Sequence, residues 1–304
     1  MHIPAQFSEY NKAILNASLS AFFYGLMAFF IVKLHKHAIP VEVVLFWRFA
    51  LAIIVIIALK PTVTLNLLNY HNPQYLKLFF ISLIFFTGSS FFFFKSVVLI
   101  GSGLAITIFF LFPIFVIFYE WLINKQKIHI DIFISMVIML VGLTLIHDNH
   151  SGSNKSDLGV VLAICSGFCY GSYIFLSKKF TSQVNSYNAS TVICLSNTIG
   201  FLILNLILGH QLFGNFDLSI WGHLFGISFF STALALLFLI KALAVLSATK
   251  VSILTMLEPV VTIIIGTALL NEKMSKDQIV GTLLILISSL IVTLSSRFKK
   301  IKTS

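Results

Sequence analysis

The chain is built from apolar stretches, each about as long as the hydrocarbon core of a membrane is thick. A helix needs about 20 apolar residues to cross a bilayer. Continuous apolar stretches indicate helices, because a membrane barrel would need alternating strands. Ten stretches of this kind lie at 13–32, 41–59, 76–99, 104–123, 129–146, 158–177, 188–208, 221–246, 250–270 and 278–296. The sequence therefore predicts an all-α membrane protein with ten transmembrane helices.

Composition excludes an ordinary soluble protein. Of the 304 residues, 58% are hydrophobic and 10% are charged, and the mean hydropathy is +1.01. Soluble domains are about one quarter charged. The net charge of +10 raises the question of nucleic acid, but the basic residues stand singly between apolar stretches instead of forming a groove-sized cluster. We therefore expect a lipid bilayer as the surrounding partner and no nucleic acid.

Lysine and arginine also predict the orientation of the chain. Cytoplasmic loops of membrane proteins carry more of these residues than the loops on the other side. If the N-terminus is cytoplasmic, 13 of them fall on the cytoplasmic side and 6 on the other, with Arg48 left inside the second span. We expect both termini in the cytoplasm of a multi-pass protein, and a bacterial inner membrane as its location.

The sequence repeats itself at an offset of 146 residues. Fixed-period self-similarity indicates a repeated architecture. Since each copy holds five expected spans, an odd number, the second copy must enter the membrane in the opposite sense. Such inverted repeats are typical of secondary transporters, whose substrate site lies near the midplane between the copies. The clearest matched pairs are Phe22/Phe168, Tyr24/Tyr170, Gly25/Gly171, Lys95/Lys241, Leu111/Leu257, Pro113/Pro259 and Lys127/Lys273.

This duplication divides the chain into two five-helix repeats, 12–147 and 158–296, with a linker at 148–157 and a basic tail at 297–304. His147, Asp148 and His150 flank or lie in the polar linker, where a flexible loop offers a metal no fixed geometry. The three cysteines all lie in apolar stretches without metal-site spacing, as expected for small core residues. We expect no metal site and no cofactor.

The last three expected helices, residues 231–292, carry motifs that resemble those of a known family. Small residues at a tight turn are followed by Leu-Glu-Pro, by a glutamate that closes the ninth helix and by a glycine in the tenth. The first half carries a weaker copy, with an arginine motif in the second helix and a proline in the fourth. The residues are Ser247, Ala248, Leu257, Glu258, Pro259, Glu272 and Gly281, and then Trp47, Arg48, Phe49, Phe112 and Pro113.

Over about residues 12–296, these motifs resemble the EamA family of the drug/metabolite transporter superfamily. The resemblance implies a secondary transporter that moves a small metabolite, such as an amino acid, an amine or a related solute, by alternating access. One departure from the pattern is Cys194, which takes the place of an arginine opposite Arg48. A proton as coupling ion and assembly as a homodimer stay open.

Two other classes of function compete with transport. A lipid flippase or a non-transporting assembly partner would use the same apolar helices, and a lateral opening between helices would favour the flippase. A membrane enzyme would need a paired acid and base or a metal set. The sequence has no H-E-x-x-H motif, no histidine-rich helix face and no serine-nucleophile motif, so an enzyme is disfavoured.

Charged residues inside the expected spans are the first candidates for a site, because a charge at bilayer depth costs about 2.5–3.5 kcal/mol. Arg48 could bind an anion or carboxylate, or could instead form a structural ion pair or bond to the carbonyls of a broken helix. Glu258 could bind an amine or take up a proton, or could be the fixed partner of Lys241, of Arg48 or of freed backbone groups. Lys95 and Lys241 could gate two mouths of one pathway, or could only extend to the headgroups.

Polar and helix-breaking residues complete the candidates. Tyr24 and Tyr170 are related by the repeat, and their hydroxyls could face a pathway or bond to a neighbouring helix in the core. Asn197 is central in the seventh span. Pro113 and Pro259 should interrupt their helices, because proline removes a backbone hydrogen bond. The candidate pathway residues are therefore Tyr24, Arg48, Lys95, Tyr170, Asn197, Lys241 and Glu258, with helix breaks at Pro113 and Pro259.

Overall fold

The computed structural model describes residues 5–35, 37, 39–61, 73–125, 129–146, 156–214, 216–270 and 275–302, and every regular element in these ranges is helical. The expected basic tail, 297–304, is helical as far as residue 302, and the expected linker lies outside the described residues up to 155. In the first half the elements are α1 (Ala5–Gly25), α2 (Met27–His35), α3 (Val41–Leu59), α5 (Pro73–Ile81), the π-helix η1 (Ser82–Phe86), α6 (Thr87–Ile100), α7 (Ser102–Phe109), α8 (Phe112–Leu122) and α9 (Ile130–Ile146).

The second half repeats this order of elements, except that the single helix α10 takes the place of α1 and α2. It contains α10 (Asp157–Thr181), α11 (Ser186–Leu208), α12 (Leu218–Ser228), the π-helix η2 (Phe229–Leu234), α13 (Ala235–Val245), α14 (Ala248–Thr255), α15 (Glu258–Leu270) and α16 (Lys276–Lys302). Each half therefore has one π-helical segment inside its third expected span and one interruption inside its fourth.

Eight helical segments of the described residues are long and apolar enough to cross a membrane. They are Glu9–Leu34, Val41–Leu59, Pro73–Ile100, Leu104–Leu122, Asp157–Thr181, Ser186–Leu208, Leu218–Val245 and Ala248–Leu269. Two shorter apolar stretches, Ile130–Leu145 and Ile279–Ile291, lie where the fifth and tenth spans are expected. The protein is thus an integral, multi-pass membrane protein, and the count of ten spans stays a prediction.

Polar caps define several of the helix ends. The N-cap side chains of Ser156, Asn185, Asp217 and Ser247 accept backbone N–H groups of the first turns of α10, α11, α12 and α14. Each satisfies a donor that has no partner within its helix. At the other end of α11, Gly209 has φ of 71°, a left-handed conformation that glycine adopts without steric strain. The boundaries between the apolar helices are therefore encoded locally.

Both expected proline breaks coincide with interruptions of the helices. Residues 110–111 separate α7 from α8, and residues 256–257 separate α14 from α15. Pro113 and Pro259 follow these interruptions, each as the second residue of its helix, α8 or α15. The N–H groups of the first helical turn have no partner within the helix, so proline, which lacks an N–H, breaks no hydrogen bond there. The offset of 146 superposes the two interruptions residue for residue.

Two glycines bring helices of opposite halves into close contact. A Cβ at Gly25 in α1 would lie 2.6 Å from Val261 Cβ and 3.0 Å from the Glu258 carbonyl oxygen, both in α15. A Cβ at Gly171 in α10 would lie 2.9 Å from the Phe112 carbonyl oxygen and 3.0 Å from Phe115 Cβ, both in α8. The offset of 146 exchanges these two contacts completely. The repeat in the sequence is therefore also a reciprocal repeat in the packing.

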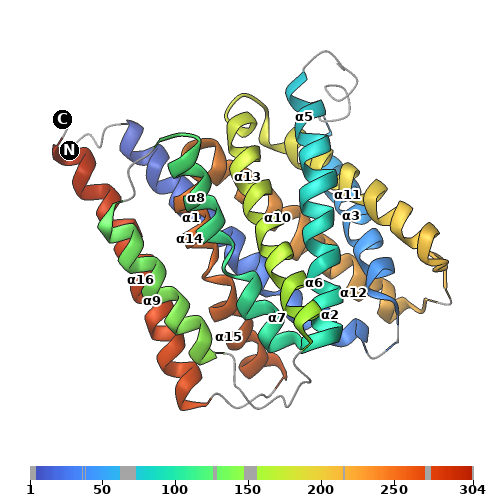
Figure 1. The fold of residues 1–304 in the computed structure, drawn as a ribbon. Helices are drawn as coiled ribbons and strands as arrows, with labels where there is room; N and C mark the ends of the chain where they lie inside the picture. Colours follow the sequence, from blue (N-terminus) through green and yellow to red (C-terminus); the bar gives the residue numbers. More distant parts are fainter. Residues whose placement is uncertain are drawn as a thin grey trace.

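The helices α9 and α16 form a separate pair at one side of the molecule (Figure 1). A Cβ at Gly142 would lie 2.7 Å from the Gly281 carbonyl oxygen, and the Ser288 hydroxyl donates to the Ser135 carbonyl oxygen at 2.6 Å. Small residues of this kind let helix backbones approach closely in a membrane. The offset exchanges these contacts too, since Ser135 falls on Gly281 and Gly142 on Ser288.

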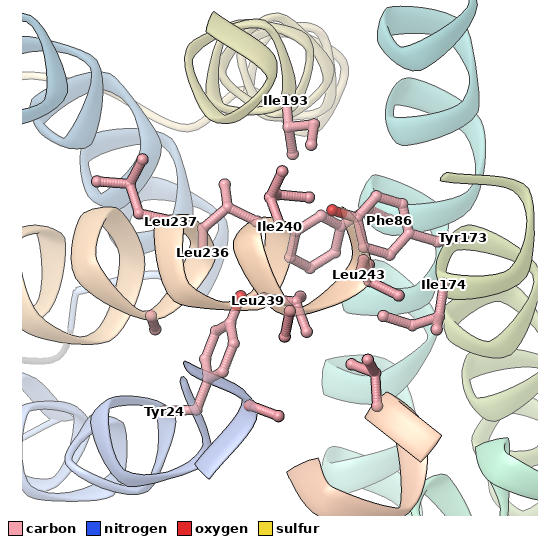
Figure 2. Packing of buried hydrophobic residues seen from close by; sticks show 14 of the residues in the cluster. Tyr24, Phe86, Tyr173, Ile174, Ile193, Leu236, Leu237, Leu239, Ile240 and Leu243 are labelled. Atoms are coloured by element: carbon pink, nitrogen blue, oxygen red, sulfur yellow. The ribbon is translucent and has the colours of Figure 1, made fainter. Parts of the chain in front are cut away.

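The main core lies around α13. Leu236, Leu239, Ile240 and Leu243 are buried there beside the Phe86 ring (Figure 2). Tyr24 of α1 extends toward α13 in the same view, and Ile193 reaches it from α11. Helices of both halves therefore share one hydrophobic core.

Candidate functional site

A cavity of about 100 Å³ lies between the two halves. A single water molecule needs about 10–15 Å³ measured in this way, so the cavity has room for several. Most lining residues come from the first half, and three come from α10, α14 and α15 of the second. The lining residues are Tyr24, Met27, Arg48, Phe86, Ser89, Ser90, Phe93, Phe94, Ile106, Phe109, Phe110, Phe112, Tyr170, Thr255 and Glu258.

Aromatic rings form much of the cavity wall. The Tyr170 ring lies edge-on to Phe112, with centroids 4.8 Å apart, and 5.3 Å from the ring of Phe109. The ring centroids of Phe109 and Phe93 are in turn 5.4 Å apart. These separations are typical of favourable aromatic pairs. Ring faces can hold an apolar body, and they also attract cations.

Glu258 contributes a carboxylate to this aromatic wall. It is the first residue of α15, where the helix dipole favours a negative charge. Among the described residues, its side chain has no hydrogen-bond or ion-pair partner. Phe112 takes the matching position in the first half, so the carboxylate is present in one repeat only.

Arg48 contributes the positive charge of the cavity. It is 5% exposed, and its guanidinium donates from Nε to Thr232 Oγ1 at 2.7 Å and from Nη2 to the Ser231 carbonyl oxygen at 3.1 Å. Two of its five N–H groups are therefore directed into η2. Both Arg48 and Glu258 are described, and no nitrogen of one lies within 4.0 Å of a carboxylate oxygen of the other. The cavity thus holds a guanidinium and a carboxyl group that do not form an ion pair with each other.

Tyr24 and Tyr170 both line the cavity, as members of a pair related by the repeat. Tyr24 is buried, whereas Tyr170 is partly exposed. The structure therefore brings together four of the seven candidate pathway residues: Tyr24, Arg48, Tyr170 and Glu258.

Asn197 is buried outside the cavity lining, in α11. Its Nδ2 donates to Ser82 Oγ at 2.7 Å and to the Ile193 carbonyl oxygen at 2.8 Å, and its Oδ1 accepts from Thr87 Oγ1 at 3.0 Å. These bonds join α11 to η1 and to the start of α6. Asn197 therefore contacts the π-helical segment of the first half.

Lys95 and Lys241 also lie outside the cavity lining. Lys95 Nζ is 3.6 Å from Glu42 Oε1, and the lysine side chain is 43% exposed. Lys241 Nζ lies over the Tyr187 ring, 5.1 Å from its centroid, and 5.6 Å from that of Phe238. The two lysines therefore have different surroundings, and their role as gates stays a prediction.

Glu120 is a buried carboxylate that was not among the candidates predicted from the sequence. It lies in α8 and accepts from the Ala248 backbone N–H at 3.1 Å and from the Thr249 hydroxyl, both at the start of α14. Nearby, Lys178 Nζ donates to the Leu243 carbonyl oxygen at 2.7 Å. Glu120 thus caps α14 from the opposite half. Its position inside the apolar stretch 104–123 was the signal that could have identified it.

Two curated relatives from bacteria match part of the chain. An uncharacterized transporter of Clostridium kluyveri is 22% identical over 183 residues, which cover 59% of each chain. The uncharacterized transporter YvbV of Bacillus subtilis is 28% identical over 204 residues, covering 66% of this chain and 65% of YvbV. The chain thus spans about three fifths to two thirds of the length of these relatives.

A protein of known crystal structure has the same fold. It superposes with a TM-score of 0.78 over 94% of this chain and 98% of its own, at 14% sequence identity. The model of the EamA-like transporter family matches residues 11–147 and again residues 157–294, so its two matches correspond to the two halves. Together these matches cover most of the sequence. The chain belongs to the EamA-like transporter family, within the drug/metabolite transporter superfamily.

Proposed function

We propose that the protein is a secondary transporter that moves an amino acid, an amine or a related small metabolite through this cavity by alternating access. The observation that supports this most strongly is the cavity itself. It lies between the two halves and is walled by aromatic rings, and it carries a carboxylate and a guanidinium beyond ion-pair distance of each other. Family membership supports transport in general, and the cavity supports this class of cargo.

The charges of the cavity suggest how such a cargo binds. An ammonium group would meet the Glu258 carboxylate, which has no partner among the described residues. The carboxylate of an amino acid would meet Arg48, three of whose N–H groups remain beyond the two that bind η2. An apolar or aromatic body would pack against the rings of Phe109, Phe112 and Tyr170. An amino acid would use both charges, and an amine would use Glu258.

For the transport cycle, we propose ten spans in two inverted repeats, 12–147 and 158–296. The first four helices of each half move about the cavity, while α9 and α16 hold to each other. That pair contributes no lining residue. Glu258 takes up a proton when the cargo ammonium leaves, which would couple transport to a proton gradient. We place the protein in a bacterial inner membrane, with both termini in the cytoplasm. This orientation agrees with α1 beginning and α16 ending at the same end of the molecule (Figure 1).

The cargo is tested by thermal unfolding of the purified protein with four probes: phenylalanine, leucine, phenethylamine and 3-phenylpropionate. We expect the ammonium-bearing compounds to raise the unfolding temperature of the wild type and to lose this effect in Glu258→Gln. Stabilisation by 3-phenylpropionate alone would contradict the assignment of Glu258. Uptake of the stabilising compound into proteoliposomes, with and without a pH gradient, then tests transport and proton coupling.

A further inference from the structure

The two π-helical segments occupy matching places in the two halves. The offset of 146 puts Ser82 on Ser228 and Phe86 on Thr232, so that η1 overlaps η2 in four of its residues. A π-helical turn accommodates an extra residue and breaks the regular α-helical bonding. Helices bend at such points, and π-helical turns are frequent at functional sites. The third and eighth expected spans therefore share one irregularity at matching positions of the repeat.

Each π-helical segment is bound by a polar side chain from the second helix of the opposite half. Arg48 of α3 donates to Thr232 and to the Ser231 carbonyl oxygen in η2. Asn197 of α11 donates to Ser82 in η1, and it accepts from Thr87, the next residue after η1. Arg48 falls on Cys194 at the same offset, three residues before Asn197, which is close to one helical turn. The two contacts are thus equivalent in place although their residues differ.

Both contacts are buried inside the molecule. Ser82 and Asn197 are 0% exposed, Thr232 is 1% exposed and Arg48 is 5% exposed. Buried polar groups are costly to leave without a hydrogen-bond partner, so each contact favours one orientation of its π-helical segment.

The segments also determine the cavity wall. Phe86, the last residue of η1, lines the cavity, and α6 continues directly from it with Ser89, Ser90, Phe93 and Phe94. On the other side, η2 holds the guanidinium of Arg48, which lines the same cavity. A change of angle at η1 would therefore move one wall, and a change at η2 would move the charged group opposite.

We propose that η1 and η2 are paired hinges of the transport cycle, and that Asn197 and Arg48 are the positioning residues that hold them. This inference rests on the proposed alternating access. Because the two halves are inverted copies, the hinge at η1 controls access to the cavity from one side of the membrane, and the hinge at η2 controls access from the other. Weakening the two contacts should therefore shift the protein in opposite directions.

The test removes one acceptor at each hinge, at residues that do not line the cavity. Ser82→Ala removes the hydroxyl bound by Asn197, and Thr232→Val removes the hydroxyl bound by Arg48. The reporter is a cysteine at Ser90, in a chain whose three native cysteines are replaced. A membrane-impermeant thiol reagent is applied to right-side-out and to inside-out vesicles, and the ratio of the two labelling rates is measured. No cargo is needed for this measurement.

We expect Ser82→Ala and Thr232→Val to change the ratio by about fivefold or more in opposite directions, the lower range of typical conformational couplings. Ser82→Thr and Thr232→Ser keep the hydroxyl and should retain the wild-type ratio. Ser96→Ala is the matched control, because the Ser96 hydroxyl of α6 is buried without a hydrogen-bond partner in the described structure. It should leave the ratio unchanged.

Shifts in the same direction, or no shift, would overturn the hinge proposal if the reporter is labelled from both sides in the wild type. Labelling from one side only in every variant would overturn alternating access, and the hinges with it. A general loss of stability cannot imitate the expected result, because a destabilised protein would be labelled faster from both sides.

Discussion

The reciprocal glycine contacts predict how the protein responds to one added methyl group. In Gly25→Ala the new Cβ would lie 2.6 Å from Val261 Cβ and 2.7 Å from its Cγ1, about 0.8 Å closer than ordinary contact begins. The Cβ of Val261 is fixed to the backbone of α15 and does not move when the side chain rotates. The helices α1 and α15 must therefore separate. Overpacking lowers the free energy of unfolding by up to about 3 kcal/mol, and the better helix propensity of alanine offsets about 1 kcal/mol of this. We expect Gly25→Ala to lower the free energy of unfolding by about 2 kcal/mol.

Gly171→Ala should cost a similar amount, because its Cβ would meet the Phe112 carbonyl oxygen at 2.9 Å. The control is Gly222→Ala in α12, where a Cβ would meet nothing within 4 Å. That variant should be stabilised by about 0.5–1 kcal/mol through helix propensity alone. The free energies of unfolding are measured by SDS titration in mixed micelles. If Gly25→Ala and Gly171→Ala were as stable as Gly222→Ala, the close cross-repeat packing would be refuted.

Two further predictions concern charged residues away from the cavity. Glu120→Ala should lower the free energy of unfolding by about 2–3 kcal/mol, because it leaves the Ala248 N–H and the Thr249 hydroxyl without their acceptor. Glu120→Gln should lower it less. Equal losses of the two variants in SDS titration would exclude this capping role. Lys95→Met should change the unfolding temperature little, because the ion pair of Lys95 with Glu42, at 3.6 Å, is partly exposed and such pairs contribute about 0–1 kcal/mol. A large fall in the unfolding temperature would mean that the ion pair stabilises the fold.

The helices and their breaks were largely predictable from the sequence. The length of each apolar stretch indicates a span, and Pro113 and Pro259 each stand two residues after an interruption of the helix. The repeat at a fixed offset also indicated which residues would lie near the interface of the halves. Tyr24 and Tyr170 were identified in this way, and both line the cavity.

The rule that a charge inside a span needs an explanation identified Arg48 and Glu258. It did not identify their partners, because a contact such as Arg48 to Thr232 joins helices 184 residues apart in the sequence. The π-helical segments were unpredictable for another reason. Their residues, such as Phe229 and Phe230 in η2, are ordinary residues of an apolar helix, and nothing in their pattern marks where a π-helical turn begins. Asn197 was noticed as polar, but its partners Ser82 and Thr87 lie 115 and 110 residues away in the sequence.

The central claim is that cargo passes through the cavity between the halves. It is tested most directly by placing one large side chain inside the cavity and another outside it on the same helix. Ser90→Trp in α6 fills the cavity, and Val98→Trp, at a site 83% exposed, projects from the molecule. The measurement is uptake into proteoliposomes of the compound that stabilises the purified wild type. We expect Ser90→Trp to abolish uptake and Val98→Trp to retain it. Normal uptake by a folded Ser90→Trp protein would contradict the account.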